Sequence, residues 1–157
     1  MMSGEQPVFR RILFPTDFSD VAQKALGYVK RLRQGYAEEV VVLHVFDRRE
    51  LRNLAAVGGI TGNYPINFDE EFKRLEENHL TKVKMIIEDL KSIGFAAKGI
   101  VREGIPLKEI LNVADEEKVS VIVLGSHGKS NLQEVMLGSV SEGVIKHSRQ
   151  PVIIIKR

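Results

Sequence analysis

Small residues at fixed spacing form the stretch of this sequence that is best suited to bind an anion. Gly125 and Gly128 are followed, after nine residues, by Gly138 and Ser139, which gives the pattern Gly-x2-Gly-x9-Gly-Ser. Glycine tolerates φ > 0 and has no Cβ, so a bulky anion can approach the main chain closely. The spacing therefore predicts a loop whose glycines take φ > 0 and whose backbone N–H groups hold a phosphate.

A helix is expected to begin directly after the last of these glycines. Ser139 and Glu142 fit the capping-box pattern Ser-x-x-Glu, which makes Ser139 the expected N-cap. The N–H groups just beyond an N-cap lack partners within the helix, and the helix dipole favours negative charge there. A phosphate can accept hydrogen bonds from those groups. The alternative is that Ser139 and Glu142 only cap the helix and that the glycines only turn the chain.

The segment GSHGKS at residues 125–130 differs from a P-loop in its spacing. A P-loop has the spacing Gly-x4-Gly-Lys-Ser, which would need a glycine where this chain has Val123. Lys129 is therefore not expected to act as a P-loop lysine. It either attracts phosphate electrostatically or lies in solvent.

Short apolar runs and helical patterns alternate along the chain and must position this loop. Strands are expected at 11–15, 39–46, 95–103, 121–124 and 152–155, and helices at 21–35, 68–94, 106–114 and 139–148. Consecutive apolar residues are typical of strands buried on both faces, and Gly99 makes the 95–103 strand an edge strand or a bent one. The alternation predicts one α/β domain over residues 1–157, a doubly wound five-stranded parallel sheet with helices on both faces.

Several polar residues follow strands of this sheet and so lie at its carboxyl edge, where open parallel sheets bind ligands. Asp17 follows the first strand, where it either caps the next helix, a role that Ser19 can also fill, or reaches a ribose, a base or a phosphate-bound metal. His44 and Val45 are among the last residues of the second strand; His44 is most simply a packed histidine, while the backbone of Val45 is placed to pair with a purine.

Two further stretches carry expectations of their own. Residues 47–67 are irregular and glycine-rich, which indicates a flap beside the site, with disorder as the alternative. The 68–94 helix is amphipathic, with Leu80 assigned to its apolar face and His79 to its charged, solvated face.

The composition excludes several classes of protein. The 23 basic and 21 acidic residues form no charge block, so nucleic acid is not an expected partner. The absence of cysteine excludes disulfides and thiolate chemistry. Without a signal peptide or an 18-residue apolar run, no membrane association is predicted, and a cytoplasmic protein is expected.

Three segments of the sequence resemble the universal stress protein family, in its ATP-binding branch. They are RILFPTDFSD at 11–20, VVVLHVFD at 40–47 and GSHGKSNLQEVMLGSVSE at 125–142. The last segment contains the family signature Gly-x2-Gly-x9-Gly-[Ser/Thr] without departure, and the resemblance extends over residues 10–156.

The resemblance implies an ATP site built from all three segments. At the adenosine end it places Pro15, Thr16 and Asp17, with the backbone of Val45 against adenine. It places Leu124 and Gly125 beside the ribose. The residues implied along the phosphates are Ser126, His127, Gly128, Lys129, Ser130, Asn131, Gly138, Ser139, Val140 and Ser141, the serines through backbone and hydroxyl groups.

The resemblance also implies partners for the chain. Mg²⁺ or Mn²⁺ accompanies the triphosphate, with Asp17 as its protein contact, although the sequence contains no metal-binding cluster of its own. A homodimer through Val152–Ile155 is implied, and an apolar strand at a sheet edge independently needs a partner strand.

Three functions remain open at this point. The first is an ATP-binding stress-response protein that acts as a nucleotide-dependent switch or interaction module for a protein partner that the sequence does not identify. The second is a slow ATPase or nucleotidyl-transfer enzyme with a metal on Asp17 and assistance from His127. The third is a nucleotide-free scaffold, which the intact glycine signature disfavours. No catalytic residue is assigned, because no arginine finger or water-positioning glutamine is recognisable.

Overall fold

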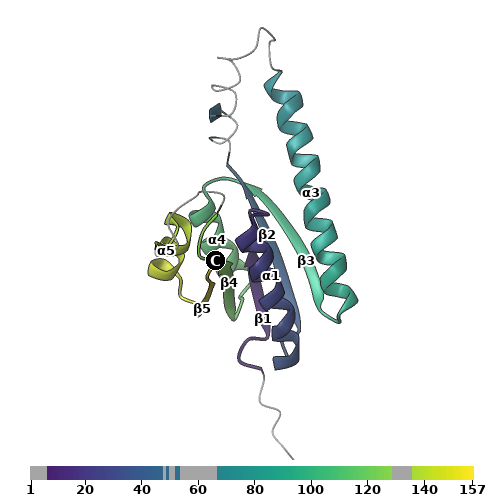
Figure 1. The fold of residues 1–157 in the computed structure, drawn as a ribbon, viewed down its shortest axis with the longest axis vertical. Coiled ribbons are helices and arrows are strands. Elements are labelled where there is room, and N and C mark those ends of the chain that lie inside the picture. Colours follow the sequence, from purple (N-terminus) through teal and green to yellow (C-terminus); the bar gives the residue numbers. More distant parts are fainter. Residues whose placement is uncertain (1–6, 48, 50–51, 54–66, 129–135) are drawn as a thin grey trace, which may run out of the picture.

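The structure is a computed structural model that describes residues 7–47, 49, 52–53, 67–128 and 136–157. Strands and helices alternate along the described chain (Figure 1). They are β1 (Arg11–Pro15), α1 (Asp20–Leu32), the 3-10 helix η1 (Arg33–Gly35), β2 (Glu39–Phe46), α3 (Phe68–Ser92), β3 (Ala96–Glu103), α4 (Pro106–Glu116), β4 (Val121–Gly125), α5 (Ser139–His147) and β5 (Val152–Ile155).

The five strands form one parallel sheet in the order β3-β2-β1-β4-β5, which confirms the predicted sheet. The chain adds β2 and β3 on one side of β1 and then β4 and β5 on the other. The order therefore reverses between β1 and β4, the kind of switch point at which α/β sheets open a crevice for a ligand. β3 and β5 are the two edge strands, and for β3 this selects the edge strand from the two alternatives that Gly99 left open.

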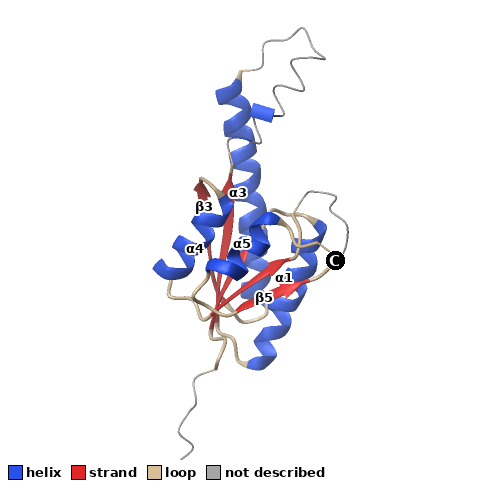
Figure 2. Ribbon diagram, turned by 90° about the vertical axis from the view of Figure 1, so that its left-hand side faces the viewer, coloured by secondary structure: helices blue, strands red, loops and turns tan. Residues whose placement is uncertain are grey.

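Helices cover both faces of the sheet, and Figure 2 shows α1 and α4 on opposite sides of the strands. On one face Phe14 and its neighbours pack against Val29 of α1 and Leu90 of α3. On the other face Leu13 packs in a cluster with Val113 of α4 and Val144 of α5. Alternate residues of one strand enter different clusters, which explains why the strands are apolar at consecutive positions.

Local signals set several boundaries of these elements. The Ser19 side chain caps α1 by accepting the Ala22 N–H at 3.3 Å. Pro106 begins α4, where its missing N–H costs nothing. Gly99 lies where α3 crosses β3, and a Cβ there would stand 2.5 Å from Val83 Cγ1, so this glycine serves close helix packing at an edge strand.

The predicted flap at 47–67 lies almost entirely outside the described residues and stays a prediction, as does the single domain over residues 1–157. In the part of the chain that the structure describes, no helix combines the length and apolar character that crossing a membrane requires.

Candidate functional site

A cavity of about 300 Å³ lies at the carboxyl ends of β1, β2 and β4, beside the start of α5. Most of the residues predicted to bind nucleotide line it, which brings three distant sequence segments together. These residues are Pro15, Thr16, Asp17, Val45, Leu124, Gly125, His127, Gly128, Gly138, Ser139, Val140 and Ser141. Lys129, Ser130 and Asn131 lie outside the described residues.

Ser126 is a predicted site residue that lies behind the cavity wall. It is 2 % exposed, and its backbone N–H donates to Ile155 O at 2.8 Å. Its carbonyl accepts the Gly138 N–H at 2.8 Å, and its hydroxyl lies 2.8 Å from His127 Nδ1. Ser126 therefore fixes the end of β4 to the start of α5 and orients the His127 ring.

The three glycines of the signature stand at close approaches of the chain. A Cβ on Gly128 would lie 2.7 Å from Asp17 Oδ2, and one on Gly138 would lie 3.3 Å from Ser126 O. A Cβ on Gly125 would lie 2.7 Å from Val21 Cγ1 of α1. The expectation that Gly125 and Gly128 adopt φ > 0 is wrong, because the positive-φ glycines of the described chain are Gly94 and Gly104. The signature instead marks positions where a Cβ would crowd a neighbouring atom.

The N-cap of α5 lies one residue earlier in the chain than the sequence predicted. Gly138 is the N-cap, with no side-chain cap hydrogen bond, and Ser139 is the first helical residue. The expected capping box is therefore wrong, and the Glu142 carboxylate accepts from Lys146 Nζ at 2.7 Å instead. The reason lies in the tertiary structure, since the Ser126 carbonyl takes the Gly138 N–H and holds that residue at the turn.

The first turn of α5 consequently offers backbone donors to the cavity. Ser139, Val140 and Ser141 line it, and a helix leaves its first N–H groups without intrahelical partners. The Ser141 hydroxyl donates to Gly125 O at 2.8 Å, so Ser141 has only its backbone N–H to give an anion. Partial positive charge at this helix start favours an anionic ligand.

The opposite wall is the turn that follows β1, held by local hydrogen bonds. Thr16 N–H donates to Leu43 O at 2.8 Å, and Thr16 Oγ1 accepts the Phe18 N–H at 3.1 Å. Asp17 Oδ1 accepts the Ser19 N–H at 3.0 Å. Of the two candidate caps for α1, Ser19 is therefore the one that fills the role, and Asp17 stands at the cavity across from Gly128.

Two histidines adjoin this wall: His44, which is among the residues that line the cavity, and His79 of α3 next to it. His44 is 3 % exposed, with Nδ1 at 2.8 Å from Thr16 O and Nε2 at 2.9 Å from His79 Nδ1. The packed role predicted for His44 agrees with this geometry. The assignment of His79 to the solvated face of its helix is wrong, and Leu80, assigned to the apolar face, is 39 % exposed. The sequence did contain a signal for this: His79 lies four residues from both Leu75 and Val83, a spacing that puts all three on the same, inward face of the helix.

His127 is 5 % exposed and lines the cavity. Its Nδ1 pairs with the Ser126 hydroxyl, while its Nε2 has no hydrogen-bond partner among the described residues. A buried polar atom without a partner costs free energy, so it is suited to meet a ligand atom.

Several lining residues were not among the predicted site residues. Ala22 comes from α1, and Pro106 and Ile110 come from α4, with His44 of β2 beside them. Pro106, Ile110 and Leu43 join Val45 in an apolar part of the wall. The α4 residues carry no motif, and only the packing of α4 over the sheet brings them here.

The donor set for a metal is small. In the described ranges no group of three or more histidine and acidic residues could hold a metal ion. Asp17 is the carboxylate among the described lining residues. One carboxylate together with ligand phosphates matches the way in which Mg²⁺ is commonly held.

Comparison with known proteins identifies the family. The model of the "Universal stress protein family" matches residues 9–156. The chain belongs to the universal stress protein family. Universal stress protein MJ0577 of Methanocaldococcus jannaschii is 43% identical over 96% of each chain. A solved structure of MJ0577 superposes with a TM-score of 0.80 at 41% identity, covering 96% of this chain and 97% of that one.

More distant universal stress proteins share the fold and have been solved with nucleotides. One from Archaeoglobus fulgidus is in complex with dAMP, at 21% identity and a TM-score of 0.60 over 95% of this chain and 99% of that one. Another is in complex with cAMP, at 19% identity and a TM-score of 0.61 over 94% and 97%.

Proposed function

We propose that this universal stress protein binds ATP in the cavity at the carboxyl edge of its sheet and acts as a nucleotide-dependent switch or interaction module in a stress response. One observation carries the proposal: α5 begins at the cavity without a side-chain cap, directly after Gly138, where a Cβ would crowd the Ser126 carbonyl. Main-chain donors at a helix start are a general solution for holding phosphate.

The rest of the cavity suits the nucleoside. Leu43, Val45, Pro106 and Ile110 offer apolar contact to a base, and Asp17 offers a carboxylate to a ribose hydroxyl. His127 Nε2 offers a further polar contact from the wall. The dAMP and cAMP complexes of two family members support an adenine nucleotide as the ligand.

Mg²⁺ or Mn²⁺ would enter with the triphosphate, with Asp17 as its protein ligand. Such an ion neutralises phosphate charge when it is bound. The Asp17 carboxylate is oriented by the Ser19 N–H on one oxygen and faces Gly128 with the other.

A second candidate function is slow ATP hydrolysis or nucleotidyl transfer. It is favoured by Asp17 and His127 lining the same cavity. The described lining residues include no arginine, lysine or glutamine that would stabilise a phosphoryl transition state or orient water. We therefore expect the protein to bind ATP but to hydrolyse or transfer it only slowly.

We also propose a homodimer through β5. This edge strand is apolar, and Val152, Ile153 and Ile154 are only half-buried. A partner strand would satisfy its free edge. Multi-angle light scattering of the wild type should give the dimer mass, and Ile153→Lys should give the monomer mass.

The test of nucleotide binding is direct. Purified protein is denatured, and the released nucleotide is identified by chromatography. Calorimetry then compares ATP, ADP, AMP and GTP, each with and without Mg²⁺. We expect retained or titrated adenine nucleotide with a preference for ATP. No released nucleotide and no binding heat with ATP would overturn the proposal, and rapid single-turnover formation of ADP or AMP would favour the enzyme.

A further inference from the structure

The His44–His79 pair joins the long helix α3 to the wall of the cavity. A backbone carbonyl can only accept, so His44 Nδ1, at 2.8 Å from Thr16 O, carries the proton of that hydrogen bond. In a neutral ring His44 Nε2 is then the acceptor, and His79 Nδ1, at 2.9 Å, is the donor. A directed chain of hydrogen bonds thus runs from α3 through β2 to the carbonyl of Thr16.

The turn that this chain reaches contains a strained residue. Phe18 has a φ of 63°, a conformation that costs free energy for a residue with a Cβ and persists only when its surroundings enforce it. Its ring centroid lies 4.6 Å from that of His44 and 5.3 Å from that of His79. The two histidine rings therefore hold the side chain that keeps the turn in this conformation.

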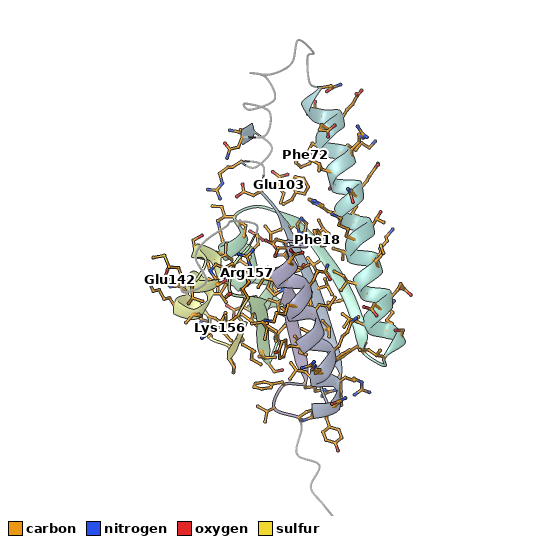
Figure 3. The ribbon with its side chains drawn as sticks, viewed as in Figure 1. Phe18, Phe72, Glu103, Glu142, Lys156 and Arg157 are labelled. Atoms are coloured by element: carbon orange, nitrogen blue, oxygen red, sulfur yellow. The ribbon has the colours of Figure 1, made fainter. Side chains whose placement is uncertain are left out.

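More aromatic rings complete the cluster. Phe46 lies 5.2 Å from His79 and 4.7 Å from Phe72, centroid to centroid. In Figure 3, Phe18, Phe72 and Glu103 all lie toward the end of the sheet where α3 extends beyond it. The histidines are thus enclosed mainly by apolar rings, where added positive charge is poorly solvated.

Charged groups are present on each element packed around the cluster. Lys82 of α3 places Nζ 5.2 Å from the Phe18 centroid, and Asp17 follows Thr16 in the turn. Asp47 follows β2 and is bound by Arg49 at 2.6 Å, and the β2–β3 register places Glu103 beside Phe46. Lys82 opposes protonation of the pair, whereas the three carboxylates favour it.

We propose that His44 and His79 are positioning residues for the 16–18 turn and that their protonation state controls its geometry, and with it the affinity of the cavity for nucleotide. The affinity part rests on the proposed function, whereas the effect on the turn does not. Through the hydrogen bonds of this pair, a change in the 16–18 turn is also transmitted to α3.

The chemistry of two facing rings determines the response to pH. One added proton keeps the 2.9 Å hydrogen bond, because one ring still offers a bare nitrogen to the other. A second proton places N–H groups on both sides of the gap and two cations beside Lys82. The rings then separate, the Phe18 ring loses its packing, and the turn that presents Asp17 is released.

The first experiment uses ligand-free wild-type protein. Assigned imidazole nitrogen signals and backbone amide signals are followed by NMR from pH about 8 to about 5, across the ordinary histidine pKa of about 6.5. We expect His44 and His79 to titrate as a coupled pair in two steps, with the Asp17 and Phe18 amides shifting at the second step. Independent titration of the two rings, with those amides unmoved, would overturn the proposal whether or not nucleotide binds.

Two substitutions of His44 separate its two nitrogens. His44→Asn keeps a nitrogen donor near the position of Nδ1 for the Thr16 carbonyl, and His44→Gln can place its amide oxygen near the position of Nε2 as the acceptor for His79. We expect His44→Gln to bind MgATP roughly 5- to 10-fold more weakly than His44→Asn, because it leaves the Thr16 carbonyl unpaired. Equal affinities in two folded variants would contradict the positioning role.

A substitution on α3 tests the protonation step. His79→Asn keeps a donor near Nδ1 but cannot become charged. Lowering the pH from about 8 to about 5.5 should weaken MgATP binding about threefold less in His79→Asn than in the wild type, because titration of ATP itself is common to both proteins. Identical losses would overturn the role of His79. If no variant binds nucleotide, the proposed function has failed, and the ligand-free titration alone decides the proposal for the turn.

Discussion

The two walls of the cavity are built in opposite ways. The wall from β4 to α5 presents the main chain, with Gly125, Gly128 and Gly138 at close approaches and an uncapped helix start. The wall after β1 presents side chains, and its turn is held by hydrogen bonds and by the packing of Phe18 on His44 and His79. The first wall depends on the absence of side chains at its glycines. The second wall depends on side chains that β2 and α3 supply to support its turn.

This difference determines which wall can be predicted from the sequence. Glycine spacing is a local property, so the main-chain wall is visible as a motif. The side-chain wall draws His79 from a helix 35 residues further along the chain than His44, and no short motif contains both. Substitutions on the two walls should therefore have effects of different kinds.

Gly128→Val should have the largest effect on binding. Its side chain would enter the space next to Asp17 Oδ2, 2.7 Å from the position of a Cβ. The valine would push the Asp17 carboxylate aside and fill space at the loop, and a loss of about 3 kcal/mol of binding free energy corresponds to an ATP affinity roughly 100-fold weaker by calorimetry. Gly35→Val is the matched control, because a Cβ there meets nothing within 4 Å. Unchanged affinity in a folded Gly128→Val protein would break the contrast between the walls.

Gly125→Ala should act on stability instead. A Cβ would stand 2.7 Å from Val21 Cγ1 and 3.3 Å from the Val21 carbonyl carbon, and Val21 is 3 % exposed and cannot yield easily. The free energy of unfolding in urea should fall by about 1–3 kcal/mol. Gly27→Ala in α1 meets nothing within 4 Å and should raise it by up to about 1 kcal/mol. An unchanged free energy of unfolding for Gly125→Ala would show that α1 shifts to make room for the added Cβ.

Asp17→Ala tests the side-chain wall. We expect ATP affinity to fall about tenfold, and the free energy of unfolding to fall by about 1 kcal/mol as the Ser19 N–H loses its acceptor. The exposed Asp20 provides the control as Asp20→Ala, with little effect on affinity. A larger loss of stability than of binding free energy would reduce Asp17 to a residue that only shapes the turn.

The smallest effect is expected at the opposite edge of the sheet. A hydrogen bond from Lys98 and the charge of Arg11 hold the pKa of Glu117 below its ordinary value of 4.5. Because its pKa is depressed in the folded state, Glu117 stabilises the fold above the unfolded-state pKa, and this contribution is lost as the pH falls through the folded-state pKa.

Glu117→Gln should therefore lower the free energy of unfolding by about 0.5–1 kcal/mol at pH 7. The loss should vanish in acid, below the folded-state pKa of Glu117, and ATP affinity should be unchanged at both pH values. Urea unfolding at the two pH values makes the measurement. A pH-independent loss would assign the effect to packing.

Most of the fold followed from the sequence. The consecutive apolar residues of β2 and β4 predicted strands buried on both faces, and Gly99 predicted an edge strand or a bent one. The family and the residues of the main-chain wall followed from the glycine signature. These properties are local in the chain, and short-range sterics and hydrophobic spacing determine them.

The errors share one cause. The N-cap moved from Ser139 to Gly138 because the Ser126 carbonyl, twelve residues earlier, takes the Gly138 N–H. His79 turned inward because α3 packs beside β2, where His44 Nε2 lies 2.9 Å from His79 Nδ1. In both cases a partner distant in sequence competes with the local pattern and prevails.

The sequence by itself determined the strand and helix order, the glycine spacing and the family. Only the tertiary structure decided that the start of α5 is uncapped, that Asp17 faces Gly128, and that His44 and His79 pack against the 16–18 turn. The physical reason is that backbone conformation and apolar periodicity are set by neighbouring residues, whereas hydrogen-bond partners and close approaches are set by which elements the fold brings together.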